Sequence, residues 1–150
     1  YNPPAPEPET NTPPTVEINI PSGAINGVYR GPILLTGRAT DPETGLDSIE
    51  MRLDSGEWFD VQVRNGDWRK ALLLGAHSGE VKVEVRAFDG TDYSEIKSVI
   101  LSYDNLPPEI SFVSPESGDT ISNTVNIVLD VSDDHNLSFV SFAVDGKESQ

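Results

Sequence analysis

The sequence predicts an all-β fold in which two sheets face each other as a β-sandwich. From Thr15 onward the apolar residues recur at every second position, which is the period of a strand with one buried face. Gly, Pro, Asn and Asp separate these runs, as expected for turns. About seven such runs in roughly 90 residues, with a turn signal about every ten residues, are typical of a sandwich.

Five of the predicted strands show this alternation directly. They are residues 15–20, 32–40, 47–54, 80–89 and 94–103. In the first four, alternation assigns these residues to the core: Val16, Ile18, Ile20, Ile33, Leu35, Gly37, Ala39, Ile49, Met51, Leu53, Val81, Val83, Val85 and Ala87. Their polar neighbours, Arg38, Glu50 and Arg52 among them, are expected to face water.

Residues 57–74 predict a hairpin that supplies the other two strands. Asn65 and Gly66 suit the two central positions of a type I′ turn, which both need positive φ. This turn sets Val63 opposite Trp68 and Arg64 opposite Asp67. The same register leaves Trp58 on the outer face and gathers the apolar side chains on the other: Phe59, Val61, Val63, Trp68 and Leu72.

The chain repeats itself after about ninety residues. The segment NTPPTVEINIPSGAI (residues 11–25) returns as NLPPEISFVSPESGDTI (105–121), so Asn105 follows Asn11 by 94 positions. Further on, LLTGRATD (34–41) corresponds to IVLDVSDD (127–134), and LDSIEMRLD (46–54) to LSFVSFAVD (137–145). A period of this size is a whole sandwich domain, so the sequence predicts a tandem array.

Three segments follow from the repeat. Residues 1–14 are rich in proline and predict an extended linker, although a free tail has the same composition. Residues 15–104 form one complete sandwich, and residues 105–150 supply about three strands of a second, truncated one. The chain begins with Tyr1 rather than Met, so we expect a fragment or a processed form.

The composition excludes several classes of function. The formal net charge of −15 repels nucleic-acid phosphates and anionic lipid surfaces, so we expect neither partner. The chain has no cysteine, which rules out disulfides and thiolate chemistry. It contains no apolar run near the ~20 residues of a membrane helix, and we expect no direct membrane insertion.

Four segments together resemble a bacterial or archaeal immunoglobulin-like domain of the tandem-repeat type: PPTVEINIPSGA, GRATDPETGLDSIEMRLDSGEW, GDWRKAL and GEVKVEVRAFDG. The resemblance covers residues 15–104, and 107–150 as far as the second copy extends. It implies a sandwich of the immunoglobulin or fibronectin III kind. Such domains serve as spacers in secreted and surface-anchored proteins, among them adhesins, S-layer proteins and accessory modules of extracellular hydrolases. The cysteine pair of antibody domains and the tryptophan of their third strand are missing.

The sequence predicts no enzymatic activity. Its two histidines, His77 and His135, lie in different repeats. It has no Gly-x-Ser-x-Gly elbow, no phosphate-binding glycine loop and no His-x-x-x-His pair. We therefore assign no catalytic residue.

Two groups of residues with side-chain oxygens are candidates for binding calcium, which is the one cofactor that the sequence suggests. Asp41, Glu43, Asp89 and Asp92 lie in two loops that share one end of such a sandwich. The second group combines the link between the copies with the equivalent loop of the second copy: Asp104, Asn105, Asp133 and Asp134. Neither group fits the Asp-x-Asp-x-Asp-Gly pattern, and the same residues are common in ordinary turns, so calcium is a hypothesis.

Trp58 is the candidate for ligand binding, because a ring on the outer face offers a surface on which a sugar can stack. A single exposed aromatic residue is a weak platform, and many such residues have no binding role.

The function that these observations favour is that of a non-enzymatic spacer in an extracellular or cell-surface multidomain protein of the adhesin or S-layer type. The alternative is a module that binds carbohydrate or protein and is attached to an extracellular hydrolase. The expected partners are neighbouring immunoglobulin-like domains of the same chain, and another protein chain or a surface glycan.

Overall fold

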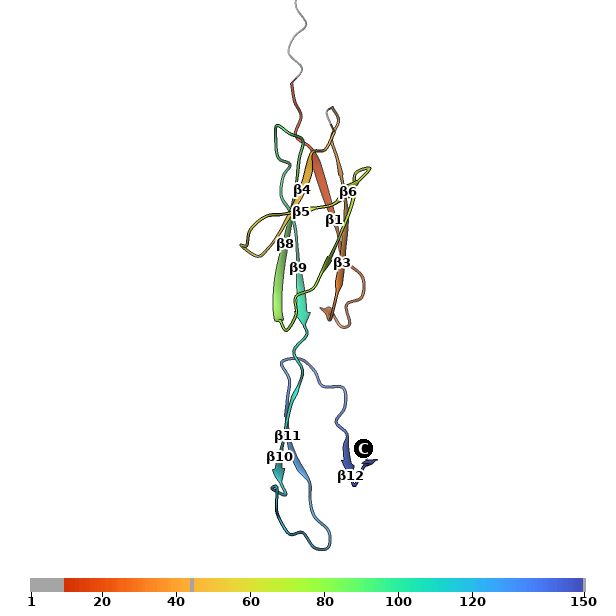
Figure 1. Cartoon of the computed structure of the whole chain (residues 1–150), viewed down its shortest axis with the longest axis vertical. Helices are drawn as coiled ribbons and strands as arrows, with labels where there is room; N and C mark the ends of the chain where they lie inside the picture. The colour runs from red at the N-terminus through yellow and green to blue at the C-terminus, as the bar shows by residue number, and fades with distance from the viewer. Residues whose placement is uncertain (1–9, 44, 150) are drawn as a thin grey trace, which may run out of the picture. The chain divides into compact units, whose positions relative to one another are not determined.

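The computed structural model describes residues 10–43 and 45–149, so most of the predicted linker, residues 1–14, lies outside the described part (Figure 1). The described residues contain strands and turns and no helix, and the all-β prediction is confirmed. Their contacts divide the chain after Asp104 into two compact units. None of the described residues belongs to a helix long and apolar enough to cross a membrane.

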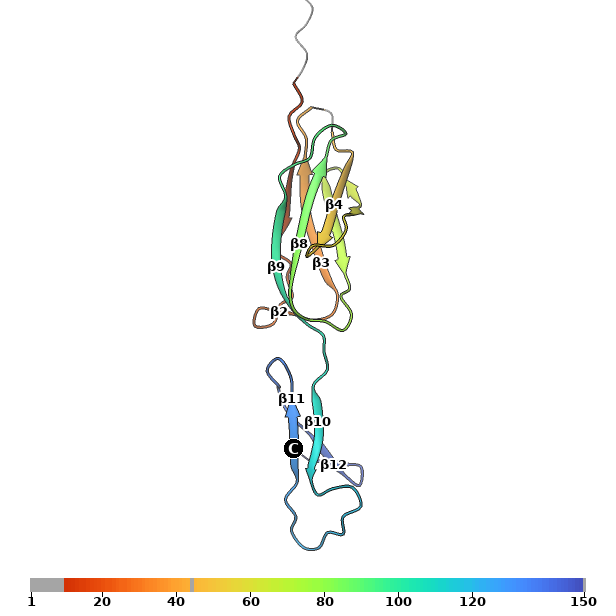
Figure 2. The same cartoon turned by 90° about the vertical axis from the view of Figure 1, so that its left-hand side faces the viewer.

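The first unit contains two sheets with a common core. One has the strand order β1-β3-β7-β6 and the other the order β2-β9-β8-β4-β5, in which only the pair β2 and β9 is parallel. Figure 2 shows β9, β8 and β4 side by side. The bounds are β1 Thr15–Asn19, β2 Val28–Tyr29, β3 Ile33–Thr40, β4 Ser48–Leu53, β5 Phe59–Val61, β6 Val63–Arg64, β7 Asp67–Leu72, β8 Ser78–Phe88 and β9 Lys97–Asp104.

Alternation predicted most of this core. The predicted inward residues of β3, β4 and β8 are buried or packed against the core, and those that are buried include Ile33, Leu35, Ala39, Ile49, Met51, Val81, Val83, Val85 and Ala87. Trp68 and Leu72 of β7 face the same core. The two inner faces therefore form one apolar layer, which is the arrangement expected of a sandwich.

The Asn65-Gly66 turn forms as predicted, but the strand before it is interrupted. The φ angles of these residues are 53° and 84°, and the ladder pairs Val63 with Trp68. Before Gln62, however, β5 pairs with β4 of the other sheet, with Val61 opposite Ile49. The prediction of one continuous hairpin strand was therefore wrong, because the chain passes from one sheet to the other between β5 and β6.

Two smaller differences concern the start of the first unit. Ile20 was assigned to the core but is 80% exposed, because β1 ends at Asn19 and the residue after Ile20 is Pro21, which lacks the N–H that a ladder needs. The two-residue strand β2 was not predicted. It pairs with β9, with Val28 beside Ser102, and a partner so distant in sequence leaves no local signal.

The second unit contains four strands in two antiparallel pairs. They are β10 Glu109–Ser114, β11 Val128–Ser132, β12 Phe142–Val144 and β13 Lys147–Ser149. A turn at Asp145-Gly146, with φ angles of 49° and 77°, joins β12 to β13. The third strand predicted for this unit, residues 137–145, is thus shorter than expected and pairs with a segment that was not predicted.

The ladders of the two units match, with a small correction to the repeat alignment. In the first unit Thr15 pairs with Thr40, and in the second Glu109 pairs with Ser132. Since Thr40 and Ser132 end equivalent strands, Asp41 corresponds to Asp133 and not to Asp134. A shared hydrogen bond in the two loops, described below, supports this equivalence.

Candidate functional site

The outer face of the five-stranded sheet carries a stack of aromatic rings and guanidinium groups around Trp58. The guanidinium carbons of Arg52 and Arg86 lie 4.6 and 4.2 Å from the centroid of the Trp58 ring. Arg86 also lies 3.9 Å from the ring centroid of Tyr93, which stacks on Phe88 at 4.6 Å. Arg86 thus contacts two aromatic rings, an arrangement that is favourable because a ring face attracts a cation.

Ion pairs hold these arginines in position. Arg86 and Glu50 lie opposite each other on β8 and β4, and their side chains pair at 2.6 Å. Arg52 pairs with Glu84 at 2.6 Å, and Lys82 pairs with the other oxygen of Glu84 at the same distance. The hydrogen bonds from Lys82 and Arg52 lower the pKa of Glu84 below its ordinary value.

Trp58 is therefore less accessible than the sequence suggested. Its side chain is half-buried, and a sugar that stacked on its ring would meet Arg52 and Arg86. Alternation already predicted that Arg52 lies on the outer face, and the same pattern in β8 accounts for Arg86. Neither pattern predicted the contact of the two arginines with Trp58, which lies in the loop before β5. The assignment of a ligand to Trp58 stays a prediction.

At the end of the sandwich where β1 begins, Asn11 joins the two aspartates of one loop. Its side-chain nitrogen donates to Oδ2 of Asp89 at 2.9 Å and to Oδ2 of Asp92 at 3.0 Å. The other oxygen of Asp89 accepts the backbone N–H groups of Thr91 and Asp92 at 2.7 and 2.8 Å. The bonds from Asp92 and Asn11 lower the pKa of Asp89.

Asp41 organises the neighbouring loop in a similar way. Its Oδ1 accepts the backbone N–H groups of Glu43 at 3.0 Å and Gly45 at 2.9 Å. Within the described residues, no three of the four carboxylates Asp41, Glu43, Asp89 and Asp92 place oxygens within 4.8 Å of one another. The structure thus joins Asp89 to Asp92 through Asn11 but does not gather all four predicted ligands.

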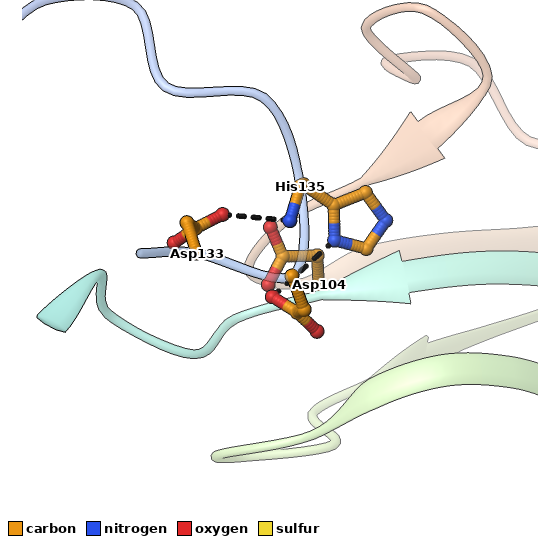
Figure 3. Close-up of side chains that lie close together, drawn as sticks. Asp104, Asp133 and His135 are labelled. Atoms are coloured by element: carbon orange, nitrogen blue, oxygen red, sulfur yellow. Dashed lines mark hydrogen bonds and ion pairs between the residues drawn. The ribbon is translucent and has the colours of Figure 1, made fainter. Parts of the chain in front are cut away.

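The other predicted metal ligands lie at the end of β9 and in the second unit. Asp104, the last residue of β9, pairs with Arg30 at 2.8 Å, and Asn105 begins the second unit. The backbone N–H of His135 donates to Oδ1 of Asp133 at 2.9 Å (Figure 3). This bond repeats the one from Glu43 to Asp41.

In the second unit, Asp133, Asp134 and His135 each offer a ligand atom, and these atoms lie within 4.8 Å of one another. The prediction did not include His135, although it directly follows the two aspartates in the sequence. Carboxylate oxygens suit calcium, whereas an imidazole nitrogen is a ligand that transition metals prefer. Calcium binding stays a prediction for both groups of residues.

A known family resembles the second unit in sequence. Residues 108–150 match the sequence model of the family described as "Bacterial Ig domain". No curated protein matches the chain. The second unit is therefore similar to a bacterial immunoglobulin-like domain, and the recurrence of its β10–β11 ladder as the β1–β3 ladder agrees with the predicted immunoglobulin-like sandwich in the first unit.

Proposed function

We propose that this chain is a load-bearing spacer, in which immunoglobulin-like modules follow one another and hold other domains of a secreted or cell-surface protein apart. In this role the chain performs no catalysis and its partners are the neighbouring modules. A protein of the adhesin or S-layer type would use it in this way, outside the cell.

The observation that carries the proposal is the recurrence of one strand pair. The β1–β3 ladder of the first unit returns as the β10–β11 ladder of the second, about ninety residues later. The two units therefore share a strand architecture, and modules of one architecture that follow one another in a chain add to its length. Length and stiffness are then the properties that repetition supplies.

The two ends of the first unit support a spacer role, because they lie at opposite ends of the sandwich. Asn11 bonds to the loop that follows β8. Asp104 pairs in the ladder with Ser78, the first residue of β8. The 11 residues of β8 separate these two positions, which is about 36 Å at a rise of ~3.3 Å per residue.

The strand pairing also suits mechanical load. A force that pulls on both ends acts on β1 and β9, which are bound to β3 and β8 by antiparallel ladders. The ladder of β9 with β8 extends over eight residue pairs, from Ser78↔Asp104 to Val85↔Lys97. Such a force acts along the strands and across their hydrogen bonds, so that several bonds must break together.

Force spectroscopy with handles at both ends of the chain tests this role. We expect the first unit to unfold in one cooperative step. About 90 residues at ~3.6 Å each, less the folded length, give a gain of about 280 Å. Gradual extension without a step would contradict a load-bearing module.

A second candidate is an accessory module that binds carbohydrate. Arg52 and Arg86 lie on the ring of Trp58, but Tyr93 beside Arg86 is 44% exposed, so an aromatic ring and a guanidinium group are both open to a sugar on this outer face. A glycan array tests it with the wild-type chain and the Trp58→Ala variant. Saturable binding that Trp58→Ala abolishes would favour this second function over a spacer. The matched control is Ile100→Ala, which removes an exposed apolar side chain from β9 of the same sheet.

A further inference from the structure

The four-stranded sheet carries a groove that the spacer role does not use. Its volume is about 970 Å³, within the range of about 300 to 1,000 Å³ that is usual for ligand sites. Polar side chains line it: Asn19, Thr36, Gln62, Arg64, Asp67 and Arg69. We infer that this groove binds an acidic polysaccharide, with Arg64 and Arg69 holding one anionic group of the sugar chain.

The strand register places the two arginines on the same face of the sheet. Arg64 of β6 pairs with Asp67 of β7, and Arg69 follows Asp67 by two positions. Side chains at such positions point the same way, and diagonal neighbours across two strands lie about 7 to 8 Å apart. Two long side chains at this spacing can donate hydrogen bonds to one carboxylate or sulfate group from both sides.

The charge of Asp67 is engaged elsewhere. Its Oδ1 accepts a hydrogen bond from Nη1 of Arg38 at 2.9 Å, in a pair that the β3–β7 register sets opposite each other. Within the described part of the chain, the exposed guanidinium groups of Arg64 and Arg69 have no hydrogen bond or salt bridge. Two unpaired cations in a chain of net charge −15 form a local site that is complementary to an anion.

The rest of the groove favours a sugar chain over a protein. Asn19, Thr36 and Arg69 are consecutive partners across β1, β3 and β7, and Nδ2 of Asn19 donates to Oγ1 of Thr36 at 3.1 Å. This row of amide, hydroxyl and guanidinium groups spans about 10 Å, since neighbouring strands lie ~4.8 Å apart, and it matches the hydroxyl groups of a sugar.

The apolar residues that line the groove support the same choice. Trp68 is 2% exposed and Val63 is half-buried, so neither presents the exposed apolar anchor that a protein partner uses. The groove also lies on the sheet opposite to the one that borders Trp58, so it is independent of the second candidate function.

Calorimetric titration of the whole chain tests the proposal with three oligosaccharides: an oligomer of galacturonic acid, a sulfated galactose oligomer and a neutral galactose oligomer. We expect the acidic oligomers to bind, more weakly as salt is added, and the neutral oligomer not to bind. The first two distinguish carboxylate from sulfate as the preferred group. In the double variant Arg64→Gln/Arg69→Gln, the affinity for the preferred oligomer should fall at least about tenfold.

Two controls show whether the binding depends on this groove in particular. The double variant Lys97→Gln/Lys147→Gln removes the same charge from β9 and β13, and Trp58→Ala removes the aromatic ring of the other sheet; both should bind as the wild type does. Circular dichroism checks the fold of every variant. Failure of both acidic oligomers to bind at millimolar concentration would overturn the inference. So would an equal loss in the two double variants, or a loss in Trp58→Ala.

Discussion

The indole ring of Trp68 lies directly against the backbone of Gly37, its partner in the β3–β7 ladder. A Cβ atom at position 37 would overlap Cζ2 and Cε2 of this ring and the carbonyl oxygen of Glu17 on β1. Only glycine lets the ring of Trp68 and the backbone of Glu17 approach β3 this closely.

The Gly37→Ala variant should therefore be strongly destabilised. The added methyl group meets backbone as well as side-chain atoms, so the strands have to move apart, and we expect a loss of about 3 kcal/mol in the free energy of unfolding. Urea denaturation followed by tryptophan fluorescence measures it. Leu34→Ala, on the outer face of the same strand, should lower the free energy of unfolding far less. If Gly37→Ala lowers it as little as Leu34→Ala does, the ring of Trp68 moves away from the added methyl group at little cost.

The low pKa of Asp89 makes part of the stability dependent on pH. Folding lowers this pKa, so the stability contributed by the ionised carboxylate is complete above the ordinary pKa of an aspartate, about 3.9. This stability is lost as the pH falls through the lower pKa of the folded state. We expect wild type to exceed Asp89→Asn in urea midpoint at pH 7, with the difference shrinking below about pH 3.9.

The control for this prediction is Asp60→Asn, an exposed position on β5, which should change the urea midpoint little at any pH. If the difference in urea midpoint between wild type and Asp89→Asn stays constant from pH 7 to pH 2, the charge of Asp89 does not stabilise the loop.

The contact between Arg86 and Trp58 should appear as a coupling energy. A double-mutant cycle with Trp58→Ala and Arg86→Ala isolates this contact from the salt bridge of Arg86 with Glu50. For a partly buried guanidinium on an indole ring we expect about 1 kcal/mol. The cycle of Trp58→Ala with Arg38→Ala, on β3 of the other sheet, should give no coupling energy. A coupling energy near zero in the first cycle would show that the contact between Arg86 and Trp58 does not stabilise the fold.

The calcium hypothesis gives a fourth prediction. Added calcium should raise the melting temperature, and a chelator should reverse the change. The equivalent loops offer a matched pair of variants, since asparagine keeps the oxygen that accepts the loop N–H and removes only the charge. We expect Asp133→Asn to reduce the calcium-dependent rise in melting temperature, because its loop gathers three ligand atoms. Asp41→Asn should leave this rise unchanged. No calcium-dependent shift in the wild type would end the hypothesis.

The sequence predicted those parts of the fold that depend on local patterns. Period-two alternation located the buried residues of β3, β4 and β8, and the Asn65-Gly66 pair located a turn with the right register. The passage of the chain from one sheet to the other at Gln62 was missed, because alternation continues unchanged across it. The strand β2 was missed for a different reason: its pairing with β9 spans more than seventy residues.

For the candidate sites, the sequence identified residue types better than contacts. It placed Trp58 on the outer face but could not show that two arginines from β4 and β8 would meet its ring. It identified four carboxylates at one end of the sandwich, but not that Asn11 would bond to two of them. To predict the groove on the other sheet, one would have to know the register of four strands at once, and no local sequence pattern contains it.

The passage at Gln62 has a further consequence for a module without cysteine. Antibody domains tie their two layers together with a covalent bridge, whereas here the polypeptide itself, running from β5 of one layer to β6 of the other, is the tether along one edge. The two sheets cannot separate far while this short connection is intact, so we expect both to unfold in the same event. Because the connection is the polypeptide and not a disulfide, a reducing environment would not break it.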